Sequence, residues 1–170
     1  WDWDMVSGEL YCNPAYYRML GYEPGELLPT MVASGVQLIH PEDRRMVAGA
    51  TQQLLAVEGS AELEYRMLTK AGGFVWVLSR SKVVARDGDG RPLRTVGVHT
   101  DLTVRKQIEL ELRTADAEQQ AIFNTVGMGI FLVKNRSIIR CNQRLEELFG
   151  YAPHELIGVT TECWYPTRTE

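Results

Sequence analysis

Cysteines, long apolar runs and an excess of basic charge are scarce or absent in this 170-residue sequence. Its three cysteines, Cys12, Cys141 and Cys163, form no closely spaced pair, which argues against a disulfide framework or a zinc site. We therefore expect a reducing, cytoplasmic setting. No apolar run approaches the roughly 20 residues that span a bilayer, so we expect no membrane contact by this stretch. No signal pattern precedes Trp1, and the missing initial Met indicates a piece of a longer protein.

The charge and the polar residues also argue against several functions. A net charge of −4 gives no general basic field, so we expect no nucleic-acid partner. No nucleophile, base and orienting group are grouped along the sequence, as nucleophilic catalysis would require. The glycine-rich turn at 87–90 lacks the Lys and the Ser or Thr of a phosphate-binding loop. We expect a non-enzymatic stretch without a metal site; an enzyme fragment whose site is completed elsewhere is the weaker alternative.

Strand and helix signals alternate along the first hundred residues. Asn13-Pro14 is a helix-start signal that Gly21 ends, after two short strand patterns. The acidic turn after Pro41 begins a longer helix, which ends at Gly59. Its expected apolar stripe is Met46, Val47, Ala50, Leu54 and Val57. Three strands follow at 62–67, 74–85 and 93–100, the last two joined by the turn at 87–90.

Strand 74–85 carries apolar side chains on both of its alternating faces. Phe74, Trp76 and Leu78 share one face, whereas Val75, Val77 and Val83 share the other. A strand of this kind is central in its sheet or has its outer face covered by another element.

Residues 102–126 contain no Gly or Pro and predict one long helix. Ile108, Ala115 and Ile122 recur every seven residues, and so do Leu112, Gln119 and Val126. The two sets are offset by three and four, which is typical of a coiled-coil seam of about three heptads. The alternative is a helix packed on the sheet of its own domain.

An internal repeat relates the two ends of the chain. Cys12-Asn13, Leu20-Gly21-Tyr22, Pro24 and Glu26-Leu27 recur at one constant offset as Cys141-Asn142, Phe149-Gly150-Tyr151, Pro153 and Glu155-Leu156. The chain therefore contains one whole unit, a helical linker and the first part of a second unit. Because the second copy reaches only Glu170, we expect it to be poorly ordered, to pack on a neighbour, or to be completed by further sequence.

The order of elements and their motifs resemble a PAS domain of a bacterial signalling protein. The residues that carry the resemblance are Asn13-Pro14, Leu20-Gly21-Tyr22, Pro24, Glu26-Leu27, residues 38–44, Tyr65-Arg66-Met67, Lys70, Gly72, Trp76-Val77, Asp89-Gly90, Gly97-Val98 and Asp101-Leu102-Thr103. The resemblance implies an α+β fold: a five-stranded antiparallel sheet in the order 2-1-5-4-3, with helices on one face and a long linker helix after it. It implies a PAS domain at 1–103, a linker helix at 104–126 and an incomplete N-terminal part of a second PAS domain at 127–170.

The resemblance also implies a sensory and signal-relay role. The chain would form a homodimer through the linker helix and transmit a signal to an output domain in the same polypeptide, such as a diguanylate cyclase or a histidine kinase. The expected relay residues are Asp101, Thr103, Ile108 and Leu112. Among them, Asp101 is expected to cap the linker helix and to bond back to the domain.

A small cavity for a ligand is the last feature that the resemblance implies. Its candidate residues are Trp3, Asn13, Tyr65, Trp76 and His99. Haem is disfavoured because residues 42–58 contain no His, and a light-sensing flavin adduct lacks its Cys between Asn13 and that helix. We expect no bound cofactor, with two alternatives: a redox sensor holding a non-covalent flavin between tryptophans, or a ligand-free structural module for dimerisation and docking.

Overall fold

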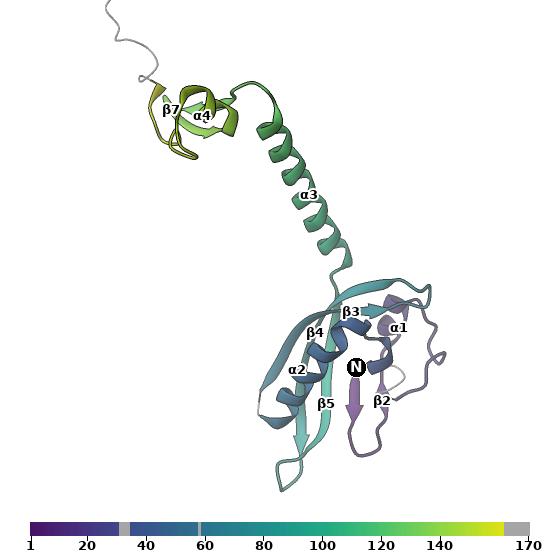
Figure 1. The fold of residues 1–170 in the computed structure, drawn as a ribbon. Helices are drawn as coiled ribbons and strands as arrows, with labels where there is room; N and C mark the ends of the chain where they lie inside the picture. The colour runs from purple at the N-terminus through teal and green to yellow at the C-terminus, as the bar shows by residue number, and fades with distance from the viewer. Residues whose placement is uncertain (31–34, 58, 162–170) are drawn as a thin grey trace, which may run out of the picture. The chain divides into compact units, whose positions relative to one another are not determined.

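The computed structural model describes residues 1–30, 35–57 and 59–161, which form two compact units, 1–108 and 109–170. The first unit contains one antiparallel sheet in the order β2-β1-β5-β4-β3 (Figure 1). Its strands are β1 (Asp2–Asp4), β2 (Leu10–Tyr11), β3 (Ser60–Leu68), β4 (Phe74–Arg86) and β5 (Pro92–Asp101). The α+β fold class and the strand order expected from the sequence are thereby confirmed.

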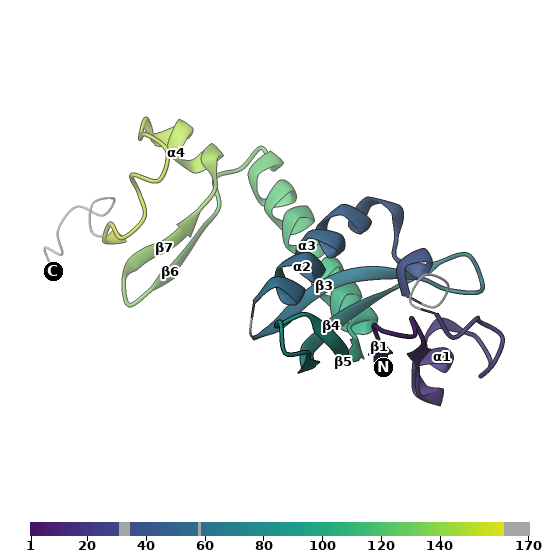
Figure 2. The ribbon, with the colours of Figure 1, turned by 90° about the horizontal axis from the view of Figure 1, so that it is seen from below.

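Helical segments connect β2 to β3. They are α1 (Pro14–Leu20), the 3-10 turns η2 (Val36–Leu38) and η3 (Pro41–Asp43), and α2 (Arg44–Ala56). The side-chain oxygen of Asn13 accepts a hydrogen bond from the backbone N–H of Tyr16 at 2.9 Å, and Gly21 ends α1 in the left-handed conformation. Both signals for α1 are therefore confirmed. In Figure 2, α2 lies beside β3.

The core of this unit lies between the helices and one face of the sheet. Leu20, Met67 and Val77 are almost completely buried there. Leu54 of α2 is buried and Val47 packs against the core. Met46 and Val57, which were expected in the same stripe, are exposed. That part of the stripe is wrong. α2 turns only the face that includes Val47 and Leu54 toward the sheet, and Val57 lies beyond the end of the helix at Ala56.

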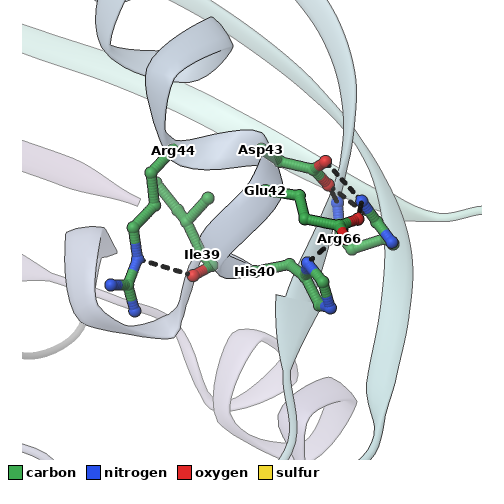
Figure 3. Close-up of polar contacts among 6 residues, drawn as sticks. All are labelled: Ile39, His40, Glu42, Asp43, Arg44 and Arg66. Carbon is green, nitrogen blue, oxygen red and sulfur yellow. Dashed lines mark hydrogen bonds and ion pairs between the residues drawn. The ribbon is translucent and has the colours of Figure 1, made fainter.

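The start of α2 is fastened to the edge strand β3 by a carboxylate. Asp43 accepts hydrogen bonds from the backbone N–H and the Nε of Arg66, both at 2.9 Å, and from its Nη2 at 2.7 Å (Figure 3). Glu42 also accepts from that Nη2, at 2.8 Å. The hydrogen bonds from Arg66 hold the pKa of Asp43 below its usual value. Asp43 thus supplies a partner for a backbone N–H of the edge strand β3, next to the point where His40 N–H donates to the Arg66 carbonyl at 2.9 Å.

The second unit repeats the local geometry of the first. It contains α3 (Thr103–Thr125) from residue 109 onward, the hairpin of β6 (Phe131–Lys134) and β7 (Ser137–Cys141), and α4 (Gln143–Phe149). Asn142 caps α4 and Gly150 ends it in the left-handed conformation, as Asn13 and Gly21 do for α1. Among its described residues, Ile138, Leu145 and Leu156 form a small buried cluster.

A close approach at Gly97 generates the first prediction. A Cβ placed there would lie 2.4 Å from the Trp1 ring and 2.7 Å from the backbone oxygen of Arg80. Gly97→Ala should therefore lower the free energy of unfolding by about 1–3 kcal/mol, the usual cost of overpacking. The control is Gly49→Ala in α2, where a Cβ meets nothing within 4 Å and should stabilise the helix by about 0.5–1 kcal/mol. Urea unfolding measures both; equal effects of the two substitutions would contradict the interpretation.

Candidate ligand cavity and relay junction

A cavity of about 420 Å³ lies between α2 and the inner face of the sheet. Alternate residues of the strands line it, because side chains on one face of a strand recur every second residue. β3 contributes Leu63, Tyr65 and Met67, and β4 contributes Ser79 and Ser81. Further lining residues are Trp1, Trp3, Leu10, Tyr16, Val47, Thr51, Leu54, Thr95 and His99. The volume is at the lower end of the range for small-molecule pockets.

His99 is the centre of the polar contacts in this cavity. Its Nε2 accepts a hydrogen bond from Trp1 Nε1 at 3.2 Å and lies 3.0 Å from the hydroxyl of Tyr65 and 3.1 Å from that of Ser79. The imidazole stacks on Tyr16, with 5.5 Å between the ring centroids. Through these contacts, His99 of β5 links β3, β4 and the residue that precedes β1.

The partners of His99 determine its tautomer. The indole nitrogen of Trp1 can only donate, so Nε2 must accept and the ring proton belongs on Nδ1. Burial lowers the pKa of His99 to about 4. His99 is therefore neutral at physiological pH and presents an Nδ1–H donor.

Two N–H donors of the cavity residues have no hydrogen-bond partner among the described residues. They are His99 Nδ1–H and Trp3 Nε1–H, and both atoms are buried. Buried donors are nearly always paired in folded proteins, so each unpaired one needs an explanation. His40 Nδ1 is a third such atom, outside the cavity lining and 4.0 Å from Glu42.

Three of the five residues expected around the cavity line it: Trp3, Tyr65 and His99. Asn13 instead caps α1. The expectation for Trp76 is wrong, because it pairs with Arg66 in the β3–β4 register and lies on the opposite face of the sheet. Its ring there contacts the guanidinium of Arg66, with 5.6 Å between the guanidinium carbon and the ring centroid.

The sequence reasoning also missed several cavity residues. Ser79 and Ser81 were not singled out, although two small polar residues interrupt an otherwise apolar face of β4 and could have marked a polar cavity wall. Thr51 and its neighbours in α2 also line the cavity, but nothing in the sequence of this helix indicates a polar cavity wall.

Asp101 and Thr103, two of the residues expected to relay a signal, lie where β5 passes into α3. The carboxylate of Asp101 accepts a hydrogen bond from the backbone N–H of Thr103 at 2.7 Å, as expected of a cap. The hydrogen bonds back to the domain come from its neighbours: Leu102 N–H donates to the backbone oxygen of Trp76 at 2.8 Å, and Thr103 Oγ1 accepts from Trp76 N–H at 3.0 Å.

The other two relay candidates, Ile108 and Leu112, lie on α3 with 59% and 69% of their surface exposed. No residue of α3 is buried against the described part of the chain. Near the start of α3, Lys106 contacts the first unit: its Nζ lies 5.2 Å from the Trp76 ring centroid and 2.6 Å from a carboxylate oxygen of Glu64.

The cavity does not fit haem or a covalent flavin adduct. His99 is the one histidine among its described lining residues, and its Nε2 already accepts from Trp1. The described residues contain no group of His, Cys, Asp and Glu that could hold a metal ion. Cys12 is outside the lining, and burial raises the pKa of its thiol to about 11, which leaves it unreactive.

Comparison with known proteins gives the same family for both units. A family model described as the PAS fold matches residues 9–99, and a PAS domain model matches residues 117–169. The chain is 29% identical over 152 residues to a blue-light-activated histidine kinase of Brucella anthropi. That alignment covers 88% of this chain and 30% of the kinase, so the chain spans less than a third of that relative.

Two solved structures share the fold. A sensory box histidine kinase/response regulator from Burkholderia thailandensis has a TM-score of 0.61 and 34% identity, over 71% of this chain and 88% of that one. The N-terminal domain of a diguanylate cyclase with PAS/PAC sensor from Marinobacter aquaeolei has a TM-score of 0.54 and 23% identity, over 62% and 95%.

Among the residues that the structure describes, no helix combines the length and the apolar character needed to cross a membrane.

The burial of neutral His99 predicts a specific pH dependence. The ordinary pKa of a histidine is 6.5, whereas that of His99 in the folded chain is about 4. As the pH falls, His99 therefore takes up a proton in the unfolded chain before it does so in the folded one. The free energy of unfolding should therefore be unaffected by His99 above pH 6.5 and should fall by up to about 3 kcal/mol by pH 4.

The test compares wild type and His99→Gln by urea unfolding between pH 4 and 7.5. Asp43, whose pKa is lowered, loses its contribution at still lower pH in both proteins, so the difference between the two curves isolates His99. Parallel curves would show that His99 does not titrate in this window.

Proposed function

The chain belongs to the PAS family, and from that premise we propose that it is a sensory and signal-relay module. In this proposal the cavity of the first unit takes a small molecule. α3 carries the resulting change toward an output domain in the same polypeptide. In this proposal the chain itself has no enzymatic role.

The observation that carries this proposal is the continuity of β5. His99 lines the cavity, and two residues later Asp101 caps α3. A strand rises about 3.3 Å per residue, so the two side chains start less than about 7 Å apart along one backbone. Little flexible chain separates the ligand cavity from the helix start.

The relay needs two arrangements of the same junction. A ligand shifts an equilibrium only by its difference in affinity for the two states. Here the contacts of Tyr65, Ser79 and Trp1 with His99 would differ between the empty and the occupied cavity. A shift of β5 against β4 would then rotate α3 or change its register.

A homodimer through α3 completes the proposal. Its heptad positions Ile108, Leu112 and Ile122 are exposed by 59%, 69% and 65%, as expected of a seam whose partner is a second copy of the chain. The alternative of packing on the sheet of its own domain receives no support, because no residue of α3 is buried against the residues that the structure describes.

The output domain and the setting are proposed from the relatives and from the thiols. Histidine kinase is the output we propose first, since the Brucella and Burkholderia relatives carry that name, and diguanylate cyclase second. Cys12 and Cys141 are free thiols, which supports a cytoplasmic location.

A second candidate is a structural interaction module that works without a ligand. The exposed heptad positions of α3 favour it, since they serve dimerisation whether or not the cavity is occupied. Absorbance of the purified protein between 350 and 450 nm would identify the flavin alternative, and native mass spectrometry would identify a colourless ligand. A cavity that holds neither, together with output unaffected by changes to its lining, would favour the structural module.

The relay proposal predicts a strong effect of Asp101→Ala. Losing the cap should cost about 1 kcal/mol at the start of α3 and change the output activity of the full parent protein at least threefold. The matched control is Asp89→Ala, an aspartate in the exposed turn between β4 and β5. It should leave output within experimental error.

Hydrogen exchange adds a local measurement. Amides of residues 104–107 should exchange faster in Asp101→Ala, whereas those of β3 and β4 should not change. Unchanged output in Asp101→Ala, despite faster exchange in α3, would sink the relay proposal.

The dimer proposal predicts different effects for two exposed leucines of α3. Leu112 lies on the heptad seam, whereas Leu110, exposed by 66%, lies off it. Leu112→Ser should weaken dimerisation at least tenfold, and Leu110→Ser should change it less than twofold. Sedimentation equilibrium measures both, with circular dichroism confirming the helix. A wild-type monomer at high concentration would remove the coiled coil.

A further inference from the structure

The lining of the cavity selects its ligand by hydrogen-bonding type as well as by size. This inference rests on the proposed function, because it assumes that the cavity is where a small molecule is sensed. Two observations that the proposed function does not use carry it: the unpartnered N–H donors of Trp3 and His99, and the distribution of charge around the cavity.

Both unpartnered atoms are donors. The indole nitrogen of Trp3 can only donate, and His99 presents Nδ1–H because its Nε2 accepts from Trp1. A ligand group that accepts hydrogen bonds, such as a carbonyl or ether oxygen, would satisfy them. A ligand group that only donates would leave both donors unpaired.

Charge in the lining excludes a cationic ligand. No carboxylate and no lysine occur among the described lining residues, and His99 is neutral at physiological pH. A positive charge would therefore be buried without a partner, which is costly.

The one charged residue in the described lining, Arg44, is committed to the backbone. Its Nε donates to the carbonyl of Ile39 at 3.1 Å, and its Nη2 donates to that of Gln37 at 3.3 Å. Figure 3 shows this guanidinium directed to the Ile39 carbonyl and away from Asp43 and Glu42. An anionic ligand would have to compete with these two carbonyls for it.

The remaining walls favour a flat apolar body. The ring centroids of Tyr16, Tyr65 and Trp1 lie 5.5 to 6.1 Å from that of His99. Leu63, Met67 and Leu54 contribute aliphatic surface. Aromatic rings pack well against other rings in offset or edge-to-face geometry.

We propose that the cavity binds an uncharged, mainly apolar ring compound that accepts hydrogen bonds, with Trp3 Nε1–H and His99 Nδ1–H as its donors. A bound ligand of this kind gives both buried donors a hydrogen-bond partner. Occupancy therefore acts on β1 through Trp3 and directly on β5, the strand that leads to α3, through His99.

Four probes on one bicyclic carbon frame test the chemistry: indane, 1-indanone, 1-aminoindane and indane-1-carboxylate. They differ only in having no polar group, a neutral acceptor, a cation or an anion. Ligand-observed NMR titration of the full 170-residue chain gives their dissociation constants. The ketone should bind at least tenfold more tightly than indane and more tightly than both charged probes. Equal binding of ketone and hydrocarbon, or tightest binding of a charged probe, would overturn the proposal.

Matched variants locate the donor. Trp3→Phe should reduce the preference for 1-indanone over indane, measured as the ratio of their dissociation constants, at least threefold. The binding of indane itself should not change. Trp76→Phe makes the same change on the opposite face of the sheet and should keep the full preference. A preference that survives in Trp3→Phe would overturn the role of its N–H.

The indole N–H signals give a direct readout. Trp3→Phe removes one of them from the nitrogen–proton correlation spectrum and so assigns it. That signal should move on titration with 1-indanone and stay in place with indane. A stationary signal under saturating ketone would contradict the hydrogen bond.

The outcomes separate this inference from the proposed function. A ketone preference lost in Trp3→Phe, together with unchanged output in Asp101→Ala, keeps the ligand class and rejects the relay. Altered output in Asp101→Ala, together with no preference among the probes, keeps the relay and rejects the ligand class. Failure of all four probes to bind the folded chain also rejects the ligand class.

Discussion

The backbone of Trp76 is the constraint on which the start of α3 depends. Its carbonyl accepts from Leu102 N–H and its N–H donates to the hydroxyl of Thr103. The ladder between β4 and β5 pairs Val77 with Asp101, so these two bonds continue it by one step past the end of β5. The hydroxyl of Thr103 takes the place of a strand carbonyl, while the residue itself already begins the helix. A residue without that hydroxyl would leave a strand N–H unpaired at the junction.

The two faces of the sheet have separate roles at this junction. On the inner face, β5 presents His99 to the cavity. On the outer face, the ring of Trp76 contacts both the guanidinium of Arg66 and the ammonium of Lys106 in α3. Arg66 in turn is held by Asp43 at the start of α2, the helix that covers the cavity. The start of α2 therefore contacts Arg66, the first turns of α3 contact Trp76, and these two strand residues are direct neighbours across β3 and β4.

The elements of the fold that depend on local chemistry could be predicted from the sequence. Asn13 and Gly21 set both ends of α1, and the repeat places Asn142 and Gly150 at the corresponding ends of α4. The choice of face for Trp76 could not be predicted, because β4 is apolar on both faces and alternation alone does not say which one is inside. The role of Asp43 was hidden for another reason. An acidic helix start normally indicates a solvated terminus, and only tertiary structure brings Arg66 to it.

α3 is anchored at its far end by the same motif asparagine that the repeat identified. Asn142 is completely buried, and its amide donates to the carbonyls of Phe123 and Met128, at 2.8 and 2.9 Å. Its side-chain oxygen accepts from Ile130 N–H and Leu145 N–H. One side chain thus joins the last turn of α3 to the strand and helix of the second unit. Asn13, its counterpart, is exposed and caps only α1. The last turn of α3 cannot fray without leaving the amide of Asn142 short of the Phe123 carbonyl, so this end of the helix is held by the second unit's own buried asparagine.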